Sequence, residues 1–221
     1  MRTVVFDLDG TLADTSGDLI AAANACLATA GHPPQLDPAQ DMLTAFAGGR
    51  AMLRLALSRI GPGWTEADID AHFPVFLQAY AGAIDVTTRL YPGAVGAVEA
   101  LRSAGFTTAI CTNKPEGLAR TLCQRLGITD LFGALVGADT LPVRKPDPAP
   151  YRAAVQGAGG DPSRSILIGD TVTDRDTARA AGVPVVLVAF GPEGAGVARL
   201  APDALLAHYD DLPALAGRLL P

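Results

Sequence analysis

The stretch TVVFDLDGT, residues 3–11, decides the fold class of this chain. Its first four residues are β-branched or aromatic, which is typical of a buried strand. The two aspartates and the glycine that follow are typical of a loop. We therefore predict a short buried strand over residues 3–6 that opens directly onto an acidic loop.

Short apolar runs of the same kind recur at residues 107–111, 134–136, 165–168 and 184–188. The stretches between them have helical patterns, at residues 93–104, 117–126, 149–158 and 174–181. Strands that alternate with helices indicate a parallel sheet covered by helices on both faces. The sequence therefore predicts an α/β fold.

One region interrupts the alternation of strands and helices. Between residues 15 and 88 we find helical patterns, at 18–30, 40–60 and 66–84, and no convincing strand. A helical insertion of this kind, directly after the first strand, is interpreted as a cap over the edge of the sheet that carries the chemistry. We predict a catalytic core made of residues 1–14 and 89–221, and a helical cap made of residues 15–88.

Composition limits the classes of function. A chain of 221 residues suffices for one α/β core and a smaller insertion. The net charge of −6 argues against a nucleic-acid partner, whose phosphates select basic surfaces. The three cysteines form no CxxC motif, and we find no apolar stretch long enough for a signal peptide or membrane span. We expect a cytoplasmic protein without nucleic-acid or membrane partners.

Polar side chains follow the predicted strands at the points where the strands end. Because the carboxyl ends of parallel strands meet at one edge of a sheet, ligands bind there. We expect the following residues to converge at that edge: Asp7, Asp9, Thr112, Asn113, Lys145, Asp170 and Asp174. Carboxylates at this density repel one another unless a cation neutralises them. Mg²⁺, which prefers oxygen ligands, suits the set, with Asp7, Asp170 and the backbone carbonyl of Asp9 as candidate ligands.

A site that contains a divalent cation and a lysine favours phosphate chemistry. Lys145, the Thr112 hydroxyl and backbone N–H groups of residues 9–11 could bind a phosphate. Asn113 either caps the following helix or contacts the phosphate as well. A carboxylate can attack phosphorus and form an aspartyl-phosphate. We assign the attack to Asp7, and to Asp9 the transfer of a proton to the leaving alcohol and later from the attacking water.

These segments together resemble a known family. DLDGTL at residues 7–12, the strand that ends in Thr112, Lys145 before Pro146, and GDTVTD at residues 169–174 are similar to the four motifs of the haloacid dehalogenase-like hydrolase superfamily. The resemblance implies a Rossmann-like, doubly wound core with a small helical cap inserted after the first motif. It also implies Mg²⁺ and an aspartyl-phosphate intermediate. Asp174 would, by resemblance, orient Lys145 or hold the metal shell.

Three comparisons narrow the activity within that superfamily. True dehalogenases lack the second aspartate of the first motif, so Asp9 argues against dehalogenation. Phosphonatases use a lysine of the cap, and no lysine occurs between Asp14 and Tyr91. β-Phosphoglucomutases share both aspartates, so a phosphotransferase of that type stays open. A small phosphatase is favoured.

The segment CTNKPE at residues 111–116 resembles phosphoglycolate phosphatases, as does YPG at residues 91–93. Gly49 and Arg50 occupy a place that suits the substrate-specificity loop of that subfamily. Since arginine makes bidentate contacts with carboxylates, Arg50 could recognise the carboxylate of 2-phosphoglycolate. The expected reaction yields glycolate and phosphate. Sugar phosphates, nucleotides and pyrophosphate remain alternative substrates.

The sequence disfavours two other classes of protein. A signalling receiver also combines acidic residues, a threonine and a lysine around an aspartyl-phosphate, but it is about half this length and has no cap. A non-catalytic binding protein with this fold is disfavoured because every chemical position is present. We expect an enzyme whose partner is a small anionic phosphorylated metabolite, and which is a monomer or homodimer.

Overall fold

The computed structural model describes residues 1–220. These residues cluster into two compact units. The first, called the core unit here, comprises Met1–Asp14 and the chain from Leu90 on. The second, the helical unit, comprises Thr15–Arg89. None of the helices within residues 1–220 is long and apolar enough to cross a membrane.

A six-stranded sheet forms the centre of the core unit. Its strand order is β5-β4-β1-β6-β7-β8, and each neighbouring pair is parallel. The strands are β1 (Thr3–Phe6), β4 (Thr107–Cys111), β5 (Ala134–Val136), β6 (Ser165–Gly169), β7 (Val185–Val188) and β8 (Ala204–Leu206). A separate two-stranded sheet pairs β2 (Ala13–Asp14) with β3 (Arg89–Leu90). The predicted α/β fold with a parallel sheet is confirmed.

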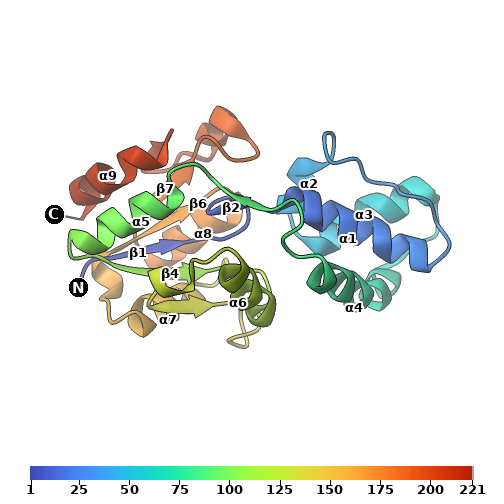
Figure 1. Cartoon of the computed structure of the whole chain (residues 1–221), viewed down its shortest axis with the longest axis horizontal. Coiled ribbons are helices and arrows are strands. Elements are labelled where there is room, and N and C mark those ends of the chain that lie inside the picture. Colours follow the sequence, from blue (N-terminus) through green and yellow to red (C-terminus); the bar gives the residue numbers. More distant parts are fainter. Residues whose placement is uncertain (221) are drawn as a thin grey trace. The chain divides into compact units, whose positions relative to one another are not determined.

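Helices cover both faces of this sheet, as Figure 1 shows. On one face α7 and α8 contact each other and the sheet, whereas α5 and α9 lie together on the other face. The helices of the core unit are α5 (Ala94–Ser103), α6 (Glu116–Arg125), α7 (Pro148–Gly157), α8 (Val172–Ala181) and α9 (Leu212–Leu219). Short 3₁₀ turns complete the unit: η1 (Thr129–Leu131), η2 (Pro162–Arg164), η3 (Gly194–Leu200) and η4 (Tyr209–Asp211).

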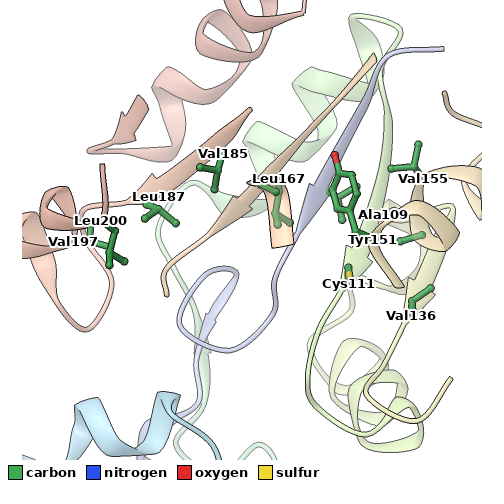
Figure 2. Packing of buried hydrophobic residues seen from close by; sticks show 13 residues of the cluster. Ala109, Cys111, Val136, Tyr151, Val155, Leu167, Val185, Leu187, Val197 and Leu200 are labelled. Carbon is green, nitrogen blue, oxygen red and sulfur yellow. The ribbon is translucent and has the colours of Figure 1, made fainter. Parts of the chain in front are cut away.

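A buried apolar cluster holds α7 and α8 on the sheet (Figure 2). Ala109 and Leu167 contribute to it from strands on either side of β1, and Tyr151 contributes from α7. The Tyr151 hydroxyl donates a hydrogen bond of 2.6 Å to Ser165 Oγ, so its one polar atom is satisfied inside the core. This packing fixes β1 between β4 and β6, the strands that lead to the other candidate site residues.

The helical unit contains α1 (Ser16–Thr29), α2 (Met42–Phe46), α3 (Gly49–Ile60) and α4 (Glu66–Gly82). The helical pattern over residues 40–60 corresponds to two helices, α2 and α3. Gly48 has a φ of 97°, a left-handed conformation that interrupts the helical backbone. The apolar spacing continues across this break.

Asp18 joins the two ends of the helical unit. Its buried carboxylate accepts hydrogen bonds of 2.7–3.1 Å from the backbone N–H and hydroxyl groups of Thr87 and Thr88. These bonds lower the pKa of Asp18 although its burial acts in the opposite direction. The first turn of α1 is therefore fixed to the last residues of the unit, about seventy positions later in the chain.

Candidate active site

Asp7 lies just beyond the carboxyl end of the central strand. Its backbone N–H donates to Ile168 O at 2.9 Å, which extends the ladder between β1 and β6 by one residue. Its Oδ1 accepts a 2.8 Å hydrogen bond from Leu8 N. The chain then turns at Gly10, whose φ of 78° is one that glycine adopts at no steric cost. The turn places Asp7 and Asp9 at the same edge of the sheet.

Lys145 lies between two carboxylates. Its Nζ is 2.6 Å from Asp174 Oδ1 and 3.2 Å from Asp7 Oδ1, and its side chain is only 2% exposed. Burial alone would lower the pKa of Lys145, but the two carboxylates outweigh it and raise the pKa above its ordinary value. Lys145 is therefore a fixed positive charge at this edge of the sheet.

Asp174, in the first turn of α8, makes two kinds of contact. Its Oδ2 accepts hydrogen bonds from Thr171 N at 3.1 Å and Thr171 Oγ1 at 2.7 Å, a capping box that starts the helix. Its Oδ1 pairs with Lys145. Gly169 leaves room for this arrangement, since a Cβ there would lie 2.4 Å from the Cβ of Asp174. The helix cap therefore also orients the lysine, in line with the role that the family resemblance implied for Asp174.

Asp170 is buried at the end of β6, and Thr11 Oγ1 donates to its Oδ1 at 3.0 Å. Its Oδ2 is buried without a hydrogen-bond partner among residues 1–220. Burial, with Asp174 and Asp7 nearby, raises the pKa of Asp170 well above its ordinary value. Burial likewise raises the pKa of Asp7 to about 6, against the opposing charge of Lys145.

The carboxylates of Asp7, Asp170 and Asp174 form one cluster, with one oxygen of each within 4.8 Å of the others. A buried carboxylate oxygen without a partner is costly, and a cation would satisfy it. An all-oxygen donor set suits a hard divalent cation such as Mg²⁺ rather than zinc. The residues present therefore fit the metal that the sequence predicted.

Asp9 has a different partner. Both of its carboxylate oxygens lie 2.7 Å from Lys114 Nζ. Lys114 was not among the predicted site residues, although it stands in the CTNKPE segment, and local pattern could not predict its pairing with Asp9, which is 105 positions earlier in the chain. The scarcity of lysine was the available signal: this arginine-rich chain has two, Lys114 and Lys145, and both lie at the site.

Thr112 and Asn113 follow β4. Thr112 is buried, and its Oγ1 accepts a hydrogen bond of 3.2 Å from Lys114 N. Asn113 does not cap the following helix: its Nδ2 donates to Lys145 O at 3.0 Å. Asn113 therefore connects the loop after β4 to the loop that carries Lys145, and Thr112 stabilises the loop after β4 itself. Their predicted contact with phosphate stays a prediction.

Arg50 and Gly49 belong to the helical unit, at the start of α3. Arg50 forms an ion pair with Asp70, and its guanidinium lies 4.7 Å from the centre of the Phe73 ring. Gly49 packs against Phe76, where a Cβ would lie 2.4 Å from the ring. The structure thus gives Gly49 a packing role. The specificity role of both residues stays a prediction.

The loop after β1 also has support from the far end of the chain. The buried Tyr209 hydroxyl in η4 donates a 2.7 Å hydrogen bond to Thr11 O. The Thr11 hydroxyl donates to Asp170, so the hydrogen bond from Tyr209 holds the backbone of the residue that contacts Asp170. No sequence pattern indicates this role, because Tyr209 lies in a short 3₁₀ turn that follows no motif.

Comparison with known proteins identifies the class. The family model described as haloacid dehalogenase-like hydrolase matches residues 1–182. That span contains the acidic cluster, Lys145 and the Asp9–Lys114 pair. The chain therefore belongs to the haloacid dehalogenase-like hydrolase family, as its motifs predicted.

Individual relatives match over nearly the whole chain. A phosphoglycolate phosphatase of Mesorhizobium japonicum is 40% identical over 98% of this chain and 96% of its own. A crystal structure from Haemophilus somnus 129PT, described as a predicted phosphoglycolate phosphatase, is 26% identical with a TM-score of 0.81, covering 97% of both chains. A hydrolase of the same family from Deinococcus radiodurans R1, solved with bound phosphate and sodium, is 27% identical with a TM-score of 0.72, covering 100% of this chain and 98% of its own.

Proposed function

We propose that the protein is a Mg²⁺-dependent phosphomonoesterase that hydrolyses 2-phosphoglycolate to glycolate and phosphate through an aspartyl-phosphate on Asp7. The observation that carries the proposal is the pairing at the end of β1, where Asp7 faces Lys145 and Asp9 faces Lys114. Two carboxylates two residues apart thus have separate environments. A difference of this kind is what a nucleophile and a proton-transfer group require.

Asp7 attacks in the first half of the proposed reaction. One of its oxygens forms a bond to phosphorus while the bond between phosphorus and the glycolate oxygen breaks. The departing oxygen takes a proton from Asp9. Asp9 must therefore be protonated when this half of the reaction begins. Lys145, held by Asp174, stabilises the negative charge of the phosphoryl oxygens, and the Thr112 hydroxyl assists.

Water enters in the second half of the reaction. Asp9, now a carboxylate, accepts a proton from the water as the water oxygen attacks phosphorus. The bond between phosphorus and the Asp7 oxygen breaks, phosphate leaves, and the Asp7 carboxylate is restored. Asp9 thus ends the cycle with the proton that it lost in the first half.

Asp7 and Asp170, together with the Asp9 backbone carbonyl, would hold Mg²⁺ in this proposal. Asp174 lies in the same cluster and supports it through Lys145. When bound, Mg²⁺ supplies positive charge that offsets the carboxylates and the phosphate oxygens. The unpartnered Asp170 Oδ2 and the acidic cluster support this assignment.

Two observations support 2-phosphoglycolate as the substrate. The relative from Mesorhizobium japonicum, which is 40% identical over 98% of this chain, is named as a phosphoglycolate phosphatase. Arg50 in the helical unit carries a guanidinium suited to a carboxylate, and its side chain is 36% exposed. We propose that the helical unit, residues 15–88, acts as a cap and that Arg50, next to Gly49, contributes to the choice of substrate.

A phosphometabolite panel at fixed Mg²⁺ tests the proposal. Wild type is expected to hydrolyse 2-phosphoglycolate faster than sugar phosphates, nucleotides or pyrophosphate, and Asp7→Asn is expected to lose turnover on all of them. Equal turnover by wild type and Asp7→Asn would refute the nucleophile. Transfer of phosphate between sugar positions without net release would indicate a phosphotransferase instead. For the cap, an unchanged preference for carboxylate-bearing substrates in Arg50→Ala would refute the role of Arg50.

A further inference from the structure

The chain has two lysines, and each neutralises a different carboxylate of the DLD segment at residues 7–9. Lys145 approaches Asp7 from the loop before α7, and Lys114 approaches Asp9 from the loop after β4. The proposed function uses Lys145 for phosphate binding. It leaves the buried ammonium of Lys114 without a task.

Lys114 is held in one place. Its side chain is only 3% exposed. Its backbone N–H donates to Thr112 Oγ1 at 3.2 Å, and its carbonyl accepts from Ala138 N at 2.9 Å. Backbone contacts on both sides therefore fix the point from which the side chain extends. A buried ammonium is stable only where an anion compensates it, and Asp9 provides that anion.

The contact is symmetrical at the carboxylate. Both Asp9 oxygens lie 2.7 Å from Lys114 Nζ, so the pair fixes the orientation of the carboxylate. The Asp9 side chain is 20% exposed, so it is not sealed from solvent. A carboxylate that is both fixed and accessible is suited to proton transfer, which depends on geometry before it depends on acidity.

Lys114 also separates Asp9 from the neighbouring acidic cluster. Within the described part of the chain that cluster comprises Asp7, Asp170 and Asp174, and Asp9 is not a member although it is two residues from Asp7. A carboxylate without its own counter-ion would compete with Asp7 for Lys145 or for a metal. With Lys114 in place, Asp9 has a counter-ion of its own, and Lys145 stays with Asp7 and Asp174.

We propose that Lys114 is a positioning residue that holds the Asp9 carboxylate for proton transfer. The proposal rests on the proposed function, because it assumes that Asp9 deprotonates the water that hydrolyses the phosphorylated Asp7. Removing Lys114 would then slow that step more than it slows the attack by Asp7. Loss of a structural lysine would slow both steps together.

Rapid-mixing kinetics of Lys114→Met with p-nitrophenyl phosphate and Mg²⁺ separate the two steps. p-Nitrophenolate leaves without a proton, so the first half of the reaction does not need Asp9. We expect a burst of p-nitrophenol close to one per enzyme at the wild-type rate. A steady phase slowed at least about tenfold should follow, since general acid–base catalysis contributes roughly 10²–10⁴-fold.

Matched variants accompany this measurement. Lys114→Arg keeps a cation and is expected to restore most of the steady rate. Arg120→Met removes an exposed cation of α6 that pairs with Glu116, and it is expected to leave both phases unchanged. Asp9→Asn should show the same burst as Lys114→Met. The double variant Asp9→Asn, Lys114→Met should be no slower than Asp9→Asn alone, because Lys114 acts through Asp9.

Several outcomes would overturn the proposal. A raised KM with an unchanged steady rate would make Lys114 a substrate ligand. Equal loss of burst and steady rates, with additive effects in the double variant, would make it a structural residue. Where Lys114→Met fails to fold, Lys114→Gln, which keeps a donor beside Asp9, must show the burst or the proposal is wrong. Failure of the proposed function is recognised separately, by wild-type turnover that does not exceed that of Asp7→Asn.

Discussion

Lys145 lies closer to Asp174, at 2.6 Å, than to Asp7, at 3.2 Å. The lysine is therefore held mainly by a residue that caps a helix, and Asp7 keeps one oxygen outside this ion pair. Both Lys145 and Asp174 are buried, so their charges interact with little screening by water.

Lys145→Met is expected to lower the free energy of unfolding by about 3 kcal/mol or more, because it leaves two buried carboxylates without their cation. Chemical denaturation at neutral pH without added divalent metal measures this change. Arg199→Met is the matched control. The Arg199 side chain, which pairs with Glu193, is 62% exposed, so this substitution should lower the free energy of unfolding by less than about 1 kcal/mol. An equal effect of the two substitutions would contradict the assignment of Lys145 as the central counter-ion.

Gly169→Ala is expected to displace Asp174, because the added Cβ would lie 2.4 Å from the Asp174 Cβ. The crowding should cost about 1–3 kcal/mol of unfolding free energy, and the turnover of p-nitrophenyl phosphate should fall as Lys145 loses its support. Gly217→Ala in α9 is the control, since the new methyl meets no atom within 4 Å among residues 1–220. That control should stabilise the helix by about 0.5–1 kcal/mol. Unaltered turnover in Gly169→Ala would show that Asp174 can move without consequence.

Mg²⁺ is expected to raise the Tm of the wild-type protein, because a ligand that binds only the folded state stabilises it. Asp170→Asn removes one carboxylate of the cluster and should abolish most of this shift. Asp176→Asn changes an aspartate of α8 that is 45% exposed, and it should keep the full shift. A thermal-denaturation series with increasing Mg²⁺ measures all three proteins. Identical shifts in the two variants would argue against a metal at the acidic cluster.

Asp18→Asn is expected to lower the free energy of unfolding by about 2 kcal/mol at pH 7, because hydrogen bonds to a charged acceptor contribute about 1.5–3 kcal/mol. The pKa of Asp18 is lowered in the folded protein from its ordinary value of 3.8. Its stabilisation is therefore complete above pH 3.8 and declines as the pH falls through the folded pKa. Denaturation of wild type and variant between pH 7 and pH 3 should show the difference narrowing only at the acidic end. A constant difference across that range would mean that the charge of Asp18 does not matter.

Much of the fold followed from local pattern. The runs at Thr3–Phe6 and Thr107–Cys111 are dense in β-branched residues, and their apolar character matches strands buried on both faces. The strand β8 (Ala204–Leu206) was missed because its sequence, ALL, contains no β-branched or aromatic residue that would favour a strand. The point at which the pattern over residues 40–60 divides into α2 and α3 was not predicted, because one backbone angle at Gly48 causes the break and the apolar spacing does not change there.

The candidate site was predicted to the extent that its residues belong to motifs. Asp7 and Asp170 directly follow predicted strands, Lys145 precedes Pro146 in a loop, and the structure places all three at one edge of the sheet. Pairings between distant segments could not be predicted in this way. Lys114 with Asp9 and Tyr209 with Thr11 depend on side chains that meet only after the sheet has formed.

The Asp18 contact has a consequence for how this protein could diversify. The insertion from residue 15 to residue 89 leaves and re-enters the core unit through ends that hydrogen bonds to one aspartate hold together. For the sheet, such an insertion is equivalent to a short surface loop, whatever its internal length. A lineage could therefore replace the whole helical module, and with it the substrate recognition that we propose for it, while the strand order and the two lysine–aspartate pairs stay as they are.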